Sequence, residues 1–303
     1  MNPKVEQIQV ILDMETQDPD DVFTLMWLAY HPRVRLKAVT LTPGSKEQVE
    51  LVWSILADFD YPRIPVGVRR FKNEKTHVNP WLYRVLKAPG IRDEAYQDAL
   101  KYSSIAHQVI ADNLTKDTVL VTCGPPANLG YFLENHPSKE VPFWLAQGGF
   151  AGDNLVAPED RLDKFNGMVT CPTFNFNGAP KAAKAGLASD MIKKRRLVSK
   201  NVCHGVIYDR KVLNENINQG VKWINDAMRE YLRKKPEGKM FHDLLAVATL
   251  IDPSICEYAE VEVYREKGLW GSRPKEGSNT WITTKVDKER FWDVFFLRKG
   301  NVV

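Results

Sequence analysis

Hydrophobic and polar residues follow two periods that alternate along the chain. Residues 7–12 form an apolar run of strand length, and residues 35–41 alternate like a second strand. Residues 20–30 and 46–59 carry apolar side chains at helical spacing. Because this strand–loop–helix rhythm places helices against a sheet, it predicts an α/β fold: an open, mostly parallel Rossmann-like sheet with helices on both faces.

The same rhythm continues to the end of the chain. Further strands are expected at 64–68, 118–122, 141–145, 196–199, 259–264 and 280–284, and further helices at 104–113, 127–135, 179–188, 218–234, 241–251 and 288–297. Segments 69–102 and 150–178 are irregular, and the first would suit either a loop over an active site or plain surface structure. No internal repeat or linker is found, so we expect one domain over residues 1–303.

The composition excludes several classes of protein. With 44% hydrophobic and 26% charged residues the chain is ordinary for a globular protein, and it lacks the run of about 18 apolar residues that spans a membrane. The net charge of +4 is too small and dispersed to indicate nucleic-acid binding. Four cysteines lie far apart, without zinc-site spacing. The N-terminus lacks the apolar core of a signal peptide, so we expect a cytoplasmic location.

Five acidic residues gather where the first strand ends. They are Asp13, Glu15, Asp18, Asp20 and Asp21. In an open parallel sheet, ligands bind outside the carboxyl ends of the strands, which is where this loop lies. Carboxylates this close together repel one another unless a cation neutralises them, and oxygen ligands favour calcium or magnesium over zinc. Helix capping explains one of the five acids, so the cluster predicts a metal site.

A second polar pair opens an apolar helix far downstream. His242 and Asp243 begin the segment HDLLAVATLIDP, whose apolar face does not need them. Each alone fits an ordinary role, Asp243 as an acid at a helix N-terminus and His242 as a surface histidine. Together with the acidic cluster, the pair supplies another metal carboxylate and a candidate proton donor.

These segments resemble the motifs of the inosine-uridine preferring nucleoside hydrolases. DMETQDPDD is similar to the family's opening motif DTDPGxDD, and HDLLAVATLIDP to its late motif HDxLAxAxxxDP. VTCGPPANLG, LAQGGFAG and FNFNGAPKAA match three further motifs in the right order. The resemblance runs from about residue 7 to residue 255. It implies the nucleoside hydrolase fold and hydrolysis of an N-glycosidic bond.

The resemblance also implies a metal site, with Ca²⁺ expected before Mg²⁺. Glu15 stands at the third place of the opening motif, which belongs to the general base and metal ligand. Asp13 matches the first aspartate, close to the metal, and is the second candidate for the base. Asp21 would be the principal ligand, Ala127 would ligate through its backbone carbonyl, and Asp243 would complete the protein ligands.

Other positions match the family's substrate contacts. Asp20 would hold the ribose hydroxyls, and His242 resembles the histidine that protonates the departing base in some members. Further candidate substrate contacts are Ser45, His77, Asn154, Thr173 and Asn175. Of these, Asn175 and Asn154 match sugar-binding asparagines.

Four departures from the family pattern concern the opening loop and the sugar contacts. The loop is one residue longer, with Glu15 in place of an aspartate. Ser45 stands in place of an asparagine, and Thr173 in place of a glutamate that contacts the 5′ side of the sugar. Because the metal carboxylates are retained, these changes bear on the glycoside rather than on the reaction. A 5′-substituted or otherwise modified nucleoside would fit them.

The chemistry is consistent with this reaction. Hydrolysis of an N-glycosidic bond passes through an oxocarbenium-like sugar that nearby carboxylates stabilise, and a hard cation activates water and clamps the diol. One alternative is a binding protein that keeps the cation and has lost turnover. Another is a phosphatase of the haloacid dehalogenase type, whose DxDxT signature DMET resembles, but Glu15 fits that signature poorly. The expected partner is a small nucleoside or related glycoside, with no nucleic acid and no membrane, and the resemblance implies a homodimer or homotetramer.

Overall fold

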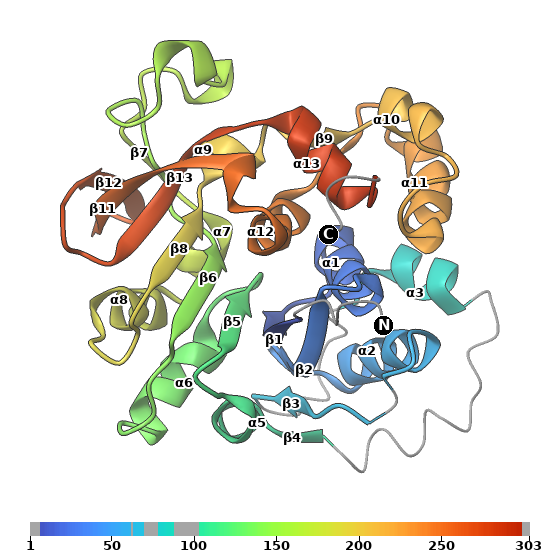
Figure 1. Ribbon diagram of the computed structural model, residues 1–303, viewed down its shortest axis with the longest axis horizontal. Helices are drawn as coiled ribbons and strands as arrows, with labels where there is room; N and C mark the ends of the chain where they lie inside the picture. The colour runs from blue at the N-terminus through green and yellow to red at the C-terminus, as the bar shows by residue number, and fades with distance from the viewer. Residues whose placement is uncertain (1–6, 62, 70–77, 88–102, 299–303) are drawn as a thin grey trace, which may run out of the picture. The chain divides into compact units, whose positions relative to one another are not determined.

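The computed structural model describes residues 7–61, 63–69, 78–87 and 103–298. Their contacts group the chain into two compact units. The first unit comprises Glu6–Trp144 and Gly178–Lys193, and the second comprises Leu145–Asn177 and Lys194–Val303. Figure 1 labels the elements of both units. The single domain expected over residues 1–303 stays a prediction.

The first unit is built on a parallel sheet. Its strands are β1 (Ile8–Met14), β2 (Val34–Leu41), β3 (Val66–Val68), β4 (Ser103–Ile105) and β5 (Thr118–Thr122). They lie in the order β4–β3–β2–β1–β5, and each pair of neighbours is parallel. β1 therefore lies between β2 and β5, with Asp13 beside Thr40 on one side and Thr122 on the other.

Helices cover both faces of this sheet (Figure 1). They are α1 (Pro19–Tyr30), α2 (Lys46–Asp58), α3 (Pro80–Lys87), α5 (Ala106–Asn113), α6 (Ala127–Asn135) and α8 (Pro180–Ala188). Helices α1 and α2 pack together on one face, while α5 and α6 pack together on the other, where α8 also contacts α6. The predicted α/β class, with a mostly parallel sheet and helices on both faces, is confirmed.

Local sequence explains how β1 leads into α1. The strand IQVILDM is buried along its last five positions, as expected for a parallel strand covered on both faces. Helix α1 begins at Pro19, since Asp18 caps it by accepting a hydrogen bond from the Asp20 backbone N–H at 2.9 Å, and proline is favoured in a first turn. Phe23 and Trp27 are fully buried and hold the helix on the core, each contributing about 1.5–3 kcal/mol. The acidic loop is thus fixed at both ends.

The second unit combines parallel and antiparallel strands. Its strands are β6 (Phe143–Gln147, whose first two residues belong to the first unit), β7 (Thr170–Cys171), β8 (Arg195–Val198), β11 (Cys256–Glu266), β12 (Leu269–Pro274) and β13 (Thr280–Val286). Five of these lie in the order β8–β13–β11–β12–β7, of which only β8 and β13 are parallel. Strands β9 (Ile207–Tyr208) and β10 (Lys239–Met240) form a separate antiparallel pair.

Short helices connect the strands of the second unit. They are η2 (Pro158–Asp160), η3 (Asp163–Phe165), α7 (Phe174–Gly178), α9 (Lys200–Cys203), α10 (Arg210–Glu215), α11 (Lys222–Lys234), α12 (His242–Ile251), η4 (Pro253–Ile255) and α13 (Lys288–Phe295). An aromatic cluster fixes the start of α12. The ring of Phe241 lies 5.1 Å from that of Tyr208 and 5.5 Å from that of Phe295, between ring centroids.

The observed elements differ from the sequence-based expectation in a few places. The helix expected at 104–113 begins at Ala106, because Ser103–Ile105 pairs as an edge strand with β3. The helix expected at 218–234 begins at Lys222. Strand β12 was not predicted. It pairs with β11 after a tight turn in which Lys267 and Gly268 adopt positive φ, and it carries charged residues at its exposed end.

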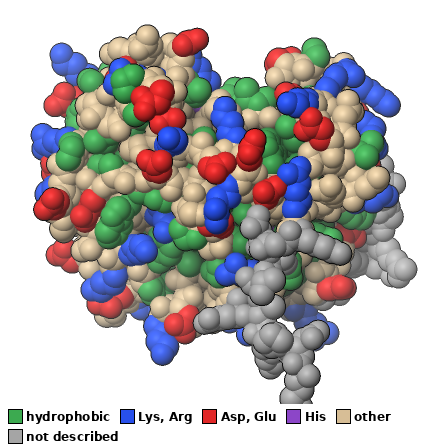
Figure 2. All heavy atoms as spheres, turned by 45° about the horizontal axis from the view of Figure 1, so that its top comes forward, with side chains coloured by type: hydrophobic (Ala, Val, Ile, Leu, Met, Phe, Trp, Pro, Cys, Tyr) green, Lys and Arg blue, Asp and Glu red, His purple; other side chains and the backbone are tan. Residues whose placement is uncertain are grey.

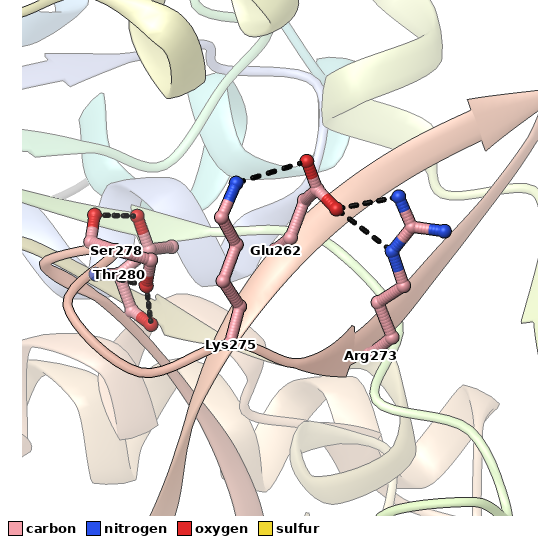
Figure 3. Close-up of polar contacts among 5 residues, drawn as sticks. All are labelled: Glu262, Arg273, Lys275, Ser278 and Thr280. Atoms are coloured by element: carbon pink, nitrogen blue, oxygen red, sulfur yellow. Dashed lines mark hydrogen bonds and ion pairs between the residues drawn. The ribbon is translucent and has the colours of Figure 1, made fainter.

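Figure 3 shows how side chains support this hairpin. Glu262 of β11 faces Arg273 of β12 and accepts hydrogen bonds from its guanidinium, from Nε at 2.7 Å and Nη2 at 2.6 Å. Lys275 reaches the other oxygen of Glu262 at 3.2 Å. At the next turn, the Thr280 backbone N–H donates to the Ser278 hydroxyl at 3.1 Å. Cross-strand pairs of opposite charge of this kind help to set the register of a sheet.

Charges of both signs are mixed on the face of the molecule shown in Figure 2. On the face in Figure 2, Lys and Arg side chains are interspersed with Asp and Glu, without a continuous basic patch. Within the described residues, no helix combines the length and the apolar character that crossing a membrane requires.

Gly67 offers a test of the packing between β3 and α5. A Cβ at this position would lie 2.8 Å from the Ala106 Cα and 3.0 Å from the Val109 Cβ, closer than packed atoms approach. We expect Gly67→Ala to lower the free energy of unfolding by about 1–3 kcal/mol, measured by urea denaturation. Gly205→Ala, whose Cβ would come no nearer than 3.3 Å to its neighbours, serves as the control. Equal effects of the two substitutions would contradict the packing account.

Candidate functional site

Asp13 is a carboxylate buried at the carboxyl end of the central strand of the first unit. Its exposed fraction is 1%. One oxygen, Oδ1, accepts hydrogen bonds from the Thr40 hydroxyl and from the Asn128 side-chain amide, both at 2.7 Å. The other oxygen, Oδ2, is buried and has no hydrogen-bond partner among the described residues. An oxygen with free lone pairs in such a place is suited to a cation.

The environment of Asp13 shifts its titration. Burial raises the pKa of Asp13 from 3.8 to about 7, although the hydrogen bonds from Asn128 and Thr40 act in the opposite direction. The protein therefore favours the neutral acid until a positive charge arrives. Asn128 is itself held in place, since its amide also donates to the Leu41 carbonyl at 3.2 Å and to the Thr42 hydroxyl at 3.1 Å.

Glu15 and Asp21 are joined by the fold of the loop between β1 and α1. The Glu15 backbone N–H donates to Asp21 Oδ1 at 3.1 Å. Burial first, and then the charge of Asp18, raise the pKa of Glu15 to about 7. Asp20 and Asp21 are buried in the first turn of α1, where the helix dipole favours negative charge. Asp18 caps that helix, which is the role that the sequence indicated for one of the five acids.

The turn that carries Ala127 runs beside this loop. The Cys123 backbone N–H donates to the Asp13 carbonyl at 2.8 Å, and the backbone of Gly124 lies close to Met14 and Glu15. Ala127 follows at the first position of α6. The backbone thus brings this turn and the acidic loop together within the first unit.

These residues fit a hard cation. Carboxylate oxygens and a backbone carbonyl are the ligands that Ca²⁺ prefers, and a cation would use the lone pairs of Asp13 Oδ2. The carboxylates do not converge within 4.8 Å as a group of three in the described part of the chain.

Ser45 has a structural role that the sequence did not reveal. Its hydroxyl accepts a hydrogen bond from the Gln48 backbone N–H at 3.3 Å, and the Gln48 side-chain oxygen accepts from the Ser45 backbone N–H at 2.9 Å. This reciprocal pair is a capping box that starts α2. His77, another candidate substrate contact, lies outside the described residues.

The remaining candidates belong to the second unit. Asn175 is buried, and its amide donates to the Gln147 carbonyl at 3.1 Å and to the Gln147 side-chain oxygen at 2.7 Å. Thr173 is buried, and its hydroxyl has no hydrogen-bond partner among the described residues. Asn154 is tied to β12 by a bond from its amide to the Ser272 carbonyl at 2.7 Å. Asn175 is therefore held rigidly, whereas the Thr173 hydroxyl has hydrogen-bonding capacity to spare.

His242 and Asp243 begin α12. Asp243 is 4% exposed. His242 Nδ1 lies 3.2 Å from Cys203 Sγ, and its ring centroid lies 4.6 Å from that of His204. Burial, followed by the charges of Lys239 and two other lysines, lowers the pKa of His242 to about 3. His242 is therefore neutral at neutral pH, and it can offer a ring N–H but stores no extra proton.

The sequence analysis did not identify the residues that contact Asp13 and His242. Thr40 and Asn128 hold Asp13, and Cys203 and His204 surround His242. Asn128 lies inside the segment VTCGPPANLG and could have been selected from it. Thr40 becomes visible only once β1 and β2 are in register, and His204 carries no motif.

Comparison with known proteins agrees with the fold. The family model described as inosine-uridine preferring nucleoside hydrolase matches residues 10–293. A curated protein of Aquifex aeolicus (strain VF5), described as uncharacterized, is 28% identical over 307 residues, which cover 96% of this chain and 99% of that protein.

Solved structures show the same fold. A plant nucleoside hydrolase is 21% identical with a TM-score of 0.70, covering 96% of this chain and 98% of that one. An inosine-guanosine nucleoside hydrolase is 18% identical with a TM-score of 0.71, covering 97% and 98%. A purine-preferring ribonucleoside hydrolase from Gardnerella vaginalis is 18% identical with a TM-score of 0.65, covering 97% and 99%.

Since the family model covers nearly the whole chain, the class is that of hydrolases acting on N-glycosyl compounds. The chain belongs to the inosine-uridine preferring nucleoside hydrolase family, whose members are metal-dependent.

The burial of Asp13 has a consequence for stability without metal. An unfolded chain ionises this acid near pH 3.8, whereas the folded protein keeps it protonated to about pH 7. Metal-free protein should therefore lose up to about 4 kcal/mol of unfolding free energy between these values as the pH rises. Asp13→Asn retains an oxygen for Thr40 and removes this loss, so its unfolding free energy should fall less over the same range.

Urea denaturation at pH 4 to 8 with a chelator measures this difference. The surface substitution Asp117→Asn is the control, and it should follow the wild type. If the unfolding free energy of Asp13→Asn changes with pH as that of the wild type does, burial does not raise the pKa of Asp13 in the folded protein.

Proposed function

We propose that this protein hydrolyses the N-glycosidic bond of a ribonucleoside or related N-riboside, using Ca²⁺ and releasing the base and the ribose. The observation that carries the proposal is the buried Asp13 carboxylate, with one oxygen held by Thr40 and Asn128 and the other free of hydrogen bonds. A carboxylate in that position at the end of a central parallel strand is explained by a cation and a substrate arriving there.

The proposed ligands are side chains of the acidic loop and one backbone group. Asp13, Glu15 and Asp21 would offer carboxylate oxygens, and Ala127 its carbonyl. Asp243 is assigned as a further ligand by its motif. When bound, Ca²⁺ supplies a positive charge that neutralises these acids, polarises the attacking water and holds the ribose diol.

Glu15 is the better candidate for the general base. Without a cation, burial raises the pKa values of both Glu15 and Asp13 to about 7, so the pKa alone does not distinguish them. Asp13 has one oxygen committed to two strong donors, so protonation there would compete with them. Glu15 is half-buried, and its side chain has one methylene more than that of an aspartate. Its carboxylate can therefore adjust its position to contact the attacking water. We therefore assign Glu15 to proton removal and Asp13 to ligation and support of the sugar cation.

The leaving base needs a proton. His242 is neutral, so it would act by donating a ring N–H hydrogen bond as the bond to the base lengthens.

Asp20 would hold the ribose hydroxyls, and Asn175 and Asn154 would contact the sugar. The spare hydroxyl of Thr173 suits the 5′ side of the substrate. Ser45 caps α2 and would place the start of that helix near the substrate. His77 stays a predicted substrate contact. We further propose a cytoplasmic location, a role in nucleoside metabolism and a homodimer or homotetramer.

Release of free base from a panel of ribonucleosides, with Ca²⁺ present, tests the proposed reaction. We expect activity in the wild type that a chelator abolishes. Glu15→Gln should lower kcat by about 100-fold or more, because loss of a general base costs about 10²–10⁴-fold. Glu159→Gln, an exposed carboxylate on η2, is the control and should keep full activity.

The variants also separate the two candidate bases. Asp13→Asn should lose Ca²⁺ affinity as well as turnover, whereas Glu15→Gln should keep most of the affinity. If Glu15→Gln turns over like the wild type while Asp13→Asn is inactive, the base is Asp13. Calorimetric binding of a nucleoside without any release of base would show a binding protein and would contradict hydrolysis.

His242→Ala tests protonation of the leaving group. Substrates with poor leaving bases should lose about 10²-fold in kcat, because they need the donated proton, and substrates with activated leaving groups should lose little. The ratio of kcat values for a natural nucleoside and a nitrophenyl riboside is the measurement. A uniform loss across both substrates would remove His242 from this role.

A further inference from the structure

Cys203, His204 and His242 form a second cluster of possible metal ligands, separate in chemistry from the acidic loop. All belong to the second unit: Cys203 ends α9, His204 follows it, and His242 opens α12. One ligand atom from each of them lies within 4.8 Å of the others. No sequence motif indicated this cluster, since the cysteines lack zinc-site spacing and His242 lies 38 positions after His204.

The three side chains are held together before any ion arrives. Helices α9 and α12 pack against each other, which brings Cys203 Sγ within 3.2 Å of His242 Nδ1. The imidazole rings of His204 and His242 lie 4.6 Å apart between centroids. Cys203 is fully buried, and its sulfur also accepts a hydrogen bond from the Gln147 side-chain amide at 3.4 Å. A partner that donates to the sulfur from outside the cluster is typical of support around a metal ligand.

The ammonium group of Lys164 contacts one of the candidate ligand atoms, His204 Nδ1. The Lys164 ammonium lies 2.6 Å from His204 Nδ1 and 3.8 Å from Met240 Sδ. The ammonium can therefore donate both to His204 Nδ1 and to the Met240 sulfur. Lys164 is attached by a flexible side chain in an exposed environment, so it can leave when a stronger cation competes.

We propose that Cys203, His204 and His242 bind a borderline-soft divalent cation of the Zn²⁺ class, with displacement of Lys164. One thiol and two imidazoles are donors that Zn²⁺ favours and that Ca²⁺ does not. With Zn–N bonds of about 2.0 Å and Zn–S bonds of about 2.3 Å, tetrahedral ligand atoms lie about 3.3–3.5 Å from one another. The Cys203 Sγ and His242 Nδ1 atoms, 3.2 Å apart, already have nearly this spacing, and the cluster as a whole, within 4.8 Å, needs only small movements to hold the ion. On binding, the S–H bond of Cys203 breaks, its proton passes to solvent, and the sulfur bonds to the metal.

Binding is tested on the full chain without substrate. The protein is freed of metal with a chelator, saturated with Ca²⁺ to occupy the carboxylates, and titrated with Zn²⁺ against a chromophoric chelator and, separately, with Co²⁺. We expect one Zn²⁺ per chain and a thiolate-to-cobalt charge-transfer band. Cys203→Ser and His204→Asn should each weaken Zn²⁺ binding by at least about 10- to 100-fold and, for Cys203→Ser, abolish the band. Lys164→Met should tighten Zn²⁺ binding by about tenfold, since it removes the competing cation.

Cys256→Ser is the matched control, because Cys256 is another buried cysteine of the second unit with no part in the cluster. Thermal unfolding confirms that each variant is folded. Zn²⁺ affinity that is the same in wild type and in folded Cys203→Ser overturns the proposal, and so does a cobalt complex without the thiolate band. If the protein binds Zn²⁺ as described but releases no base from any nucleoside, the zinc site is supported and the proposed hydrolysis is wrong.

Discussion

Burying the Asp13 carboxylate at the end of the central strand is the constraint on which the first unit depends. β1 lies between two parallel strands and is covered on both faces, so its last residues have no access to water. A charge there must be matched by hydrogen bonds and by a counter-ion. Thr40 and Asn128 satisfy one oxygen. The other oxygen has no hydrogen-bond partner among the described residues, and we propose that it binds the cation, beside the acidic loop and the turn before α6.

The two units differ in the donors that they offer. The first unit places carboxylates in the acidic loop, and the second places a thiol, two imidazoles and several lysines around the start of α12. Oxygen donors attract hard cations and sulfur and nitrogen donors attract softer ones, so the two sites that we propose would select different cations by ligand chemistry. Burial, and then the charges of these lysines, keep His242 neutral, which suits the hydrogen-bond donor to a leaving base that we propose.

Much of this was readable from the sequence. The alternation of strand and helix patterns predicted the α/β class. The expectation that one of the five acids caps a helix is met by Asp18 at the start of α1. The acidic loop stood out because repulsion among its carboxylates is hard to explain without a cation. The partners of Asp13 were not readable, since Thr40 reaches it only through the register of β1 with β2. The strand β12 was missed because its apolar content is low, and Cys203 met His242 only through the packing of α9 on α12.

The most direct test of the account is to locate the cation. Crystals grown with Ca²⁺ and a non-hydrolysable nucleoside analogue would show the ion by its anomalous scattering. The account predicts an ion about 2.3–2.6 Å from Asp13 Oδ2, with Thr40 and Asn128 still bonded to Oδ1 and the analogue's ribose hydroxyls on the same ion. An ion bound elsewhere, with Asp13 Oδ2 facing only protein, would contradict it.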